Sequence, residues 1–157
     1  RKKGLDVTAK KYLLQIKEQN IKVKKQQEYI KRLKSSLDIA GINYKEKVQS
    51  SVETDKFAKI FSQIDEEEKI LALMKNNLIK TRIKVINQIQ QLDIDKHKDI
   101  LNIVYVDCKN LREAAQEMKF SYNYAKEIHL SALKAFEKKF LPTPTENLLE
   151  TYLDTMI

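Results

Sequence analysis

The stretch that decides the fold is LREAAQEMKFSYNYAKEIHLSALKAFEKK, residues 111–139. Two apolar series at helical spacing flank a break at Phe120 and Ser121. The first series comprises Leu111, Ala114, Ala115 and Met118, and the second comprises Ala125, Ile128, Ala132, Leu133 and Phe136. Ser121 can cap the second helix, and the small Ala115 lets two helices cross closely. The pattern predicts a helix-turn-helix that binds DNA, or a helical hairpin that packs only against protein.

The order of residues across 99–139 resembles region four of bacterial sigma factors. The resemblance rests on both helices and the turn: Leu111, Ala114, Ala115, Met118, Phe120, Ser121, Ala125, Lys126, Ile128, Ala132 and Leu133. The layout, a charged helical part followed by this module, is similar to small phage-encoded transcriptional regulators related to the ArpU and RinA late-gene activators of Gram-positive hosts. The resemblance implies a sequence-specific regulator that binds double-stranded DNA, with RNA polymerase as a further partner. Lys119 stands where that family has Gly, and Tyr122 and Tyr124 stand where sigma factors carry Arg.

The second helix of this stretch has a predicted outer face near its N-terminal end, the part of a recognition helix that reaches base edges. The expected base-contacting residues, from helix phase and from the resemblance alike, are Tyr122, Asn123, Lys126 and Glu127. Asn pairs with adenine, Lys with guanine and Glu with cytosine. Phosphate contacts, which position without specifying sequence, are expected from Lys109, Arg112, Lys119, Lys134, Lys138 and Lys139.

Composition restricts the fold class. The 157 residues include two Gly, two Pro and no Trp, and 33% are charged, which is typical of an all-α chain. Cys108 is the single cysteine, so an internal disulfide is excluded, and a reducing cytoplasm is expected. No apolar run reaches bilayer length, so no membrane association is expected.

The sequence shows no catalytic motif. It has no phosphate-binding glycine loop, no Cys/His metal spacing and no nucleophile elbow, so we expect neither an enzyme nor a cofactor nor a metal site. His97 and His129 lie far apart in sequence, and His129 is expected to be structural or to contact phosphate.

The net charge of +8 indicates a polyanionic partner, but its distribution is uneven. Residues 1–54 carry a net +8, residues 55–92 a net +2, residues 93–140 a net +1, and the tail from 141 onward a net −3. Charge therefore supports nucleic-acid binding by the whole molecule better than by the helix-turn-helix alone.

The N-terminal part predicts two long helices, over residues 8–36 and 55–92, joined by a loop over 38–54. The first has a mixed seam, Leu13, Ile16, Asn20, Val23, Gln27, Ile30, Lys34 and Leu37, and a lysine-rich opposite face that is either solvated or tracks phosphates. The second has an apolar residue at every seventh position: Phe57, Ile64, Leu71, Leu78, Val85 and Leu92. This seam favours a homodimer, with a monomeric antiparallel hairpin as the alternative.

These patterns divide the chain into a coiled-coil-like dimerisation region (1–92), a DNA-binding domain (93–140) and an acidic amphipathic tail (141–157). The tail predicts a short C-terminal helix that either folds back or contacts another protein such as RNA polymerase. The complete expectation is an all-α chain: a long antiparallel coiled-coil-like hairpin, a sigma-region-four-like helix-turn-helix and a short last helix. Two rival interpretations remain open: a DNA-packaging protein like the phage small terminases, and a helical protein-interaction module without DNA binding.

Overall fold

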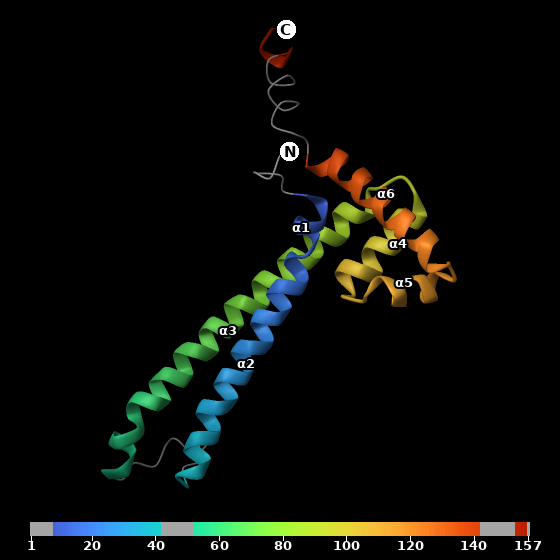
Figure 1. Ribbon diagram of the computed structural model, residues 1–157. Helices are drawn as coiled ribbons and strands as arrows, with labels where there is room; N and C mark the ends of the chain where they lie inside the picture. Colours follow the sequence, from blue (N-terminus) through green and yellow to red (C-terminus); the bar gives the residue numbers. More distant parts are fainter. Residues whose placement is uncertain (1–7, 42–51, 142–152, 157) are drawn as a thin grey trace, which may run out of the picture. The chain divides into compact units, whose positions relative to one another are not determined.

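The structure is a computed structural model that describes residues 8–41, 52–141 and 153–156. Within these ranges every regular element is a helix and none is a strand (Figure 1). The predicted all-α class is therefore confirmed. The described chain divides into two compact units, one formed by residues 18–80 and the other by the described parts of 1–17 and 81–157. The division into these units falls within the long helices α2 and α3.

The unit formed by residues 18–80 contains most of α2 (Gln15–Ile39) and the first part of α3 (Val52–Gln90). Neither helix contains Gly or Pro, so no residue interrupts the helical hydrogen bonds. Within the unit the two helices lie side by side and run in opposite directions (Figure 1). Gly41 follows α2 with a φ of 76°, a left-handed conformation that suits glycine at the end of a helix.

Apolar and polar contacts join α2 to α3. Ile30, Leu37 and Ile64 are buried in one cluster with Phe61, and Phe57 and Leu71 pack against it. Three side-chain hydrogen bonds flank the cluster: Gln26 Nε2 to Glu67 Oε2 at 2.6 Å, Lys34 Nζ to Glu68 Oε1 at 2.6 Å, and Gln63 Nε2 to Tyr29 Oη at 2.7 Å. This part of the heptad seam thus packs against α2 of the same chain.

The other seam residues are covered to different degrees. Val85 and Leu92 are buried, and Leu78 is half-buried. In the mixed seam of α1 and α2, the apolar positions are buried and Gln27 is exposed. Several large apolar residues of α3 outside the heptad seam stay exposed: Ile70, Leu73, Ile79, Ile83 and Ile86. These residues form an exposed apolar surface on α3.

The helix boundaries differ from the predictions at three places. The first predicted helix is divided into α1 (Ala9–Leu13) and α2, with Leu14 between them, and α2 continues to Ile39. The helix α3 begins at Val52 rather than at 55. Of the predicted loop over 38–54, residues 42–51 lie outside the described residues.

The second unit is built around α6 (Tyr122–Phe140), shown in orange in Figure 1. Packed against it are α1, α4 (Asp95–Leu101) and α5 (Leu111–Met118), and a π-helical turn, η2 (Asn102–Val106), follows α4 directly. The core consists of fully buried side chains from these elements and from α3: Leu13, Ile89, Ile100, Leu101, Ala114, Ala125, Ala132 and Phe136. Ala115 of α5 is also buried, with 4% of its surface exposed.

Segments far apart in sequence complete this unit. The ring of Tyr12 in α1 lies 5.8 Å from the ring of Phe136, and its hydroxyl donates to Gln88 Oε1 at 2.9 Å. Arg82, also in α3, donates to the carbonyl of Val106 at 2.8 Å. The predicted DNA-binding region therefore shares its core with α1 and with the end of α3. Of the predicted C-terminal helix, residues 153–156 are helical, and 142–152 lie outside the described residues.

Candidate nucleic-acid interface

The helix α5 begins at a capping box. The side chain of Asn110 accepts from the N–H of Glu113 at 2.9 Å, and the carboxylate of Glu113 accepts from the N–H of Asn110 at 2.8 Å. This reciprocal pair satisfies two backbone donors that the first turn of a helix otherwise leaves free. The start of α5 is thereby fixed by local sequence.

The turn between α5 and α6 is a Schellman motif. The N–H of Phe120 donates to the carbonyl of Ala115 at 2.8 Å, and the N–H of Lys119 donates to Gln116 at 3.1 Å. Lys119 has φ 59° and ψ 41°, so it adopts the left-handed conformation in the position where the sigma-like turn has glycine. A side chain in this conformation costs roughly 1–2 kcal/mol. Ser121 then caps α6, as predicted, by accepting from the N–H of Tyr124 at 3.2 Å.

The four predicted base-contacting side chains share one face of α6. Tyr122, Asn123, Lys126 and Glu127 are all exposed. Ala125 and Ala132 lie fully buried on the opposite face, and Ile128 is half-buried. These four side chains stay accessible, Tyr122 with 37% of its surface exposed, so this face is available to a partner.

Two cationic side chains contact one aromatic ring on this face. The guanidinium carbon of Arg112 lies 4.5 Å from the centre of the Tyr122 ring, and Lys126 Nζ lies 5.0 Å from it. The structure thus brings Arg112, predicted to contact phosphate, together with Tyr122 and Lys126, which are predicted to contact bases. Both cations are held close to the ring by cation–π attraction, which restricts the directions in which they can point.

A second cluster was not predicted from the sequence. Lys96 of α4 donates to the hydroxyl of Tyr124 at 3.0 Å, and its Nζ lies 5.4 Å from the centre of that ring. The rings of Phe120 and Tyr124 meet edge to face at 4.8 Å. Lys96 therefore joins α4 to the same end of α6. Its sequence position gave no signal, because only the fold brings α4 beside the turn.

The predicted phosphate contacts have different surroundings. Lys109 pairs with Glu117 at 3.2 Å, and Lys139 donates to the carbonyl of Gln91 at 2.5 Å. Lys119, Lys134 and Lys138 are exposed. Lys109 and Lys139 would have to give up their present partners to bind a phosphate. Lys119, Lys134 and Lys138 could bind one without losing such a contact.

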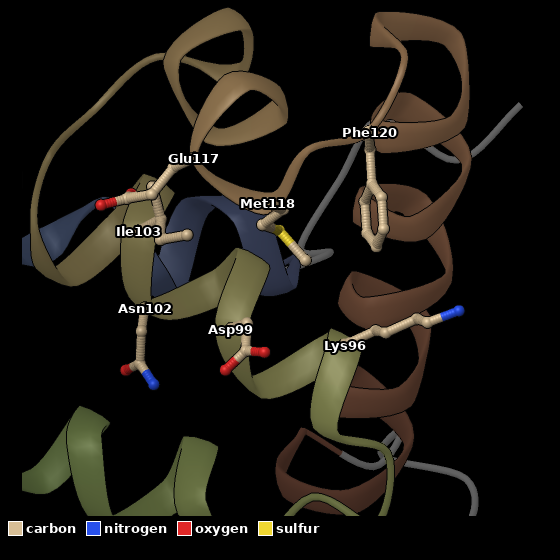
Figure 2. A pocket seen from close by; sticks show the side chains of 7 residues that line it. All are labelled: Lys96, Asp99, Asn102, Ile103, Glu117, Met118 and Phe120. Carbon is tan, nitrogen blue, oxygen red and sulfur yellow. The ribbon is translucent and has the colours of Figure 1, made fainter.

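A cavity of about 370 Å³ lies beside the turn (Figure 2). Phe120, Met118 and Ile103 provide apolar lining, and the polar side chains are Lys96, Asp99, Asn102 and Glu117. Two carboxylates against one ammonium make this cavity unsuited to DNA.

Two histidines are held in their neutral form by burial. His97 is 6% exposed, its Nε2 lies 3.1 Å from Ser131 Oγ, and burial lowers its pKa below 6.5. Burial, and then the charge of Lys10, lower the pKa of His129. Burial also raises the pKa of Tyr105, whose hydroxyl lies 2.7 Å from His129 Nε2, to about 12. These groups act as neutral hydrogen-bonding groups at pH 7.

Other types of site find no support among residues 8–41, 52–141 and 153–156. These residues contain no group of three or more His, Cys, Asp or Glu side chains placed to hold a metal ion. None of the helices traced in these segments has the length and apolar character needed to cross a membrane.

Comparison with known proteins yields no relative: no family model, no characterised protein and no solved structure matches the chain.

Proposed function

We propose that this chain is a sequence-specific transcriptional regulator of a phage or mobile element that binds double-stranded DNA. In this proposal α5, the turn and α6 act as a sigma-region-four-like helix-turn-helix, with α6 as the recognition helix. The observation that carries the proposal is the exposed N-terminal face of α6, which presents Tyr122, Asn123, Lys126 and Glu127 directly after a tight turn. A recognition helix reads DNA through this part of its surface.

The chemistry of these side chains suits the major groove. The amide of Asn123 can pair with the N6 and N7 atoms of adenine, the ammonium of Lys126 with the O6 and N7 atoms of guanine, and the carboxylate of Glu127 with the amino group of cytosine. A well-placed bidentate contact discriminates by about 1–3 kcal/mol against the wrong base. Arg112 and Lys126, both close to Tyr122, supply positive charge at the same place.

The long helices would act as a coiled-coil-like hairpin that brings two copies together. The exposed apolar residues of α3 support a homodimer, because a helix that keeps Leu73 64% exposed and Ile79 and Ile83 54% exposed gains by covering them. A twofold dimer suits a palindromic site with half-sites about 34–36 Å apart. On this proposal the protein is cytoplasmic and acts by binding rather than by catalysis.

The acidic tail would contact RNA polymerase. Residues 141–157 carry a net charge of −3 and no basic residue. Deleting residues 142–157 should abolish activation of transcription while leaving DNA affinity unchanged. Loss of both properties on deletion would contradict this part of the proposal.

One experiment tests the central proposal directly. The full chain is incubated with random duplex DNA, bound fragments are sequenced, and the selection is repeated with Asn123→Ala/Lys126→Ala. We expect an enriched motif for the unmodified chain and a weaker, altered motif for the double variant. A matched variant, Lys138→Ala/Lys134→Ala, should retain the motif at lower affinity, because phosphate contacts carry no base information. No enriched motif for the unmodified chain would refute sequence-specific binding.

A second candidate is a protein-interaction module without DNA binding. It is favoured by the net charge of only +1 over residues 93–140. In that case the salt dependence of duplex binding would be weak, and no motif would be enriched. Solution mass separates both from a DNA-packaging role like that of the phage small terminases, since a ring of many subunits would indicate packaging and a dimer would indicate regulation.

A further inference from the structure

A cavity of about 400 Å³ lies on another side of the same unit, away from the residues assigned to base contact. It is lined by α1, the start of α2, η2, the segment before α5, and the middle of α6. Three of its lining residues are lysines, Lys10, Lys17 and Lys109, and one is an acid, Glu113. Leu14 and Val104 add apolar surface. The cavity therefore combines an excess of positive charge with an apolar wall.

The single acid offsets only part of this charge. The carboxylate of Glu113 accepts from the backbone N–H of Asn110 at 2.8 Å as part of the capping box. Lys109 already pairs with Glu117 at 3.2 Å. Among the residues that the structure describes, Lys10 and Lys17 have no ion-pair partner. Two ammonium groups are thus available at the cavity.

A buried tyrosine and a half-buried histidine form one wall. The ring of Tyr105, 3% exposed, stacks on the ring of His129 at 5.6 Å, and the hydroxyl lies 2.7 Å from His129 Nε2. Which of the two groups donates depends on the imidazole tautomer. The tautomer that suits an anionic ligand is the one in which the hydroxyl donates to Nε2 and the imidazole proton is on Nδ1, where no described residue accepts it. In that tautomer the imidazole has an N–H to donate to a ligand.

We propose that this cavity binds a phosphate group. Lys10 and Lys17 would contact the phosphate oxygens, His129 would donate its Nδ1 proton, and Leu14 and Val104 would contact the organic part of the ligand. A phosphate has enough acceptor oxygens to satisfy several cationic donors at once. The volume exceeds that of a phosphate alone, so the ligand carries a further group, either as a free nucleotide or as part of a nucleic-acid backbone.

Binding should change the titration of His129. The charged and titratable groups that line the cavity with His129 are Lys10 from α1, Lys17 from α2, Tyr105 from η2, Cys108 and Lys109 from the following segment and Glu113 from α5. Burial, and then the charge of Lys10, lower the pKa of His129, and a bound phosphate would offset that charge. The pKa of His129 should therefore rise when the ligand binds in this cavity. A ligand that binds to lysines elsewhere on the surface should leave that pKa unchanged.

The test uses the full chain, three probes and two charge-matched variants. The probes are ATP, inorganic pyrophosphate and a duplex that the chain binds. The cavity variant is Lys10→Gln/Lys17→Gln, and the control is Lys11→Gln/Lys24→Gln, which changes exposed lysines of the same two helices that do not line the cavity. Affinity is measured by calorimetry, and His129 is followed by NMR of its imidazole C2–H, assigned with His97→Gln.

We expect ATP to bind, to raise the pKa of His129, and to lose at least ten-fold in affinity in the cavity variant but less than two-fold in the control. This result identifies a free phosphate ester as the ligand. Binding of the duplex alone, with the same ten-fold loss confined to the cavity variant, identifies a backbone phosphate.

Equal behaviour of the two variants with every probe would overturn the proposal. Only the duplex measurement rests on the proposed function. Failure of DNA recognition would instead be seen in the Asn123 and Lys126 variants, which lie outside this cavity.

Discussion

The Arg112 guanidinium carbon lies 4.5 Å from the centre of the Tyr122 ring, and Lys126 Nζ lies 5.0 Å from the same centre. One aromatic ring thus holds a cation from α5 and a cation from α6. Because a flexible cation loses conformational entropy when it binds DNA, prior restriction by the ring lowers the cost of binding. Tyr122 is therefore a positioning residue as well as a candidate for base contact.

Replacing Tyr122 tests this role. An exposed cation–π contact contributes about 0.5–1 kcal/mol, so Tyr122→Leu should lower affinity for the selected duplex about five-fold. Tyr122→Phe keeps the ring and should stay within about two-fold of the unmodified chain. Fluorescence anisotropy with a labelled duplex measures both. Equal losses in the two variants would show that the hydroxyl, and not the ring, matters.

The salt dependence of binding should separate specifying residues from positioning residues. Lys134→Ala and Lys119→Ala should each weaken binding to every duplex and reduce the slope of log K against log salt by about one. Asn123→Ala should change sequence preference and leave the slope unaltered, because the Asn side chain carries no charge. The measurement is affinity over a range of salt concentrations. A changed slope for Asn123→Ala would argue against a direct base contact.

Replacing Lys119 in the turn between α5 and α6 should change the free energy of unfolding. Lys119→Gly removes the steric cost of a left-handed side chain but increases the freedom of the unfolded chain. We expect the free energy of unfolding to rise by up to about 1 kcal/mol. Chemical denaturation measures the change, with Lys134→Gly as the control. Because that residue lies within α6, its replacement should cost about 1 kcal/mol. A loss of stability in Lys119→Gly would contradict the observed turn.

The two histidines predict a pH dependence of stability. Burial lowers the pKa of both His97 and His129 in the folded chain, so below pH 6.5 the unfolded chain binds more protons than the folded chain does. Stability should be constant above that pH and should fall as the pH drops below it. His97→Gln should reduce this dependence when unfolding is followed between pH 8 and pH 5. An unchanged pH dependence in that variant would show that His97 does not contribute to the pH dependence of stability.

The oligomeric state can be tested at the exposed apolar residues of α3. Ile79→Glu/Ile83→Glu adds charge to side chains that are each 54% exposed, so the monomer should still fold. If these residues form the dimer interface, the double variant should have half the solution mass of the unmodified chain. Light scattering gives the mass, and circular dichroism checks the fold. A monomeric mass for the unmodified chain would remove the dimer from the proposal.

The sequence predicted those features that local chemistry determines. The all-α class, the cap at Ser121 and the burial of Ala115 and Ala125 follow from periodicity and capping alone. Each of these depends on residues within a few positions of one another.

Features that depend on tertiary packing could not be predicted from the sequence. Lys96 beside Tyr124 and Lys10 beside His129 are separated widely along the chain, so no periodicity links them. The two compact units divide within the long helices, and a continuous helix gives no sign in its sequence of which unit each of its ends joins.

The contact between Tyr12 and Phe136 has a consequence for synthesis. The ribosome releases the α1 segment long before it makes the last turns of α6, yet the two share a core. The aromatic side chain of Tyr12 therefore stays without its packing partner until the ribosome has synthesised α6 almost completely. A transcript truncated before Phe136 would yield a chain whose early part has lost its packing partner, and such fragments should be rapidly degraded.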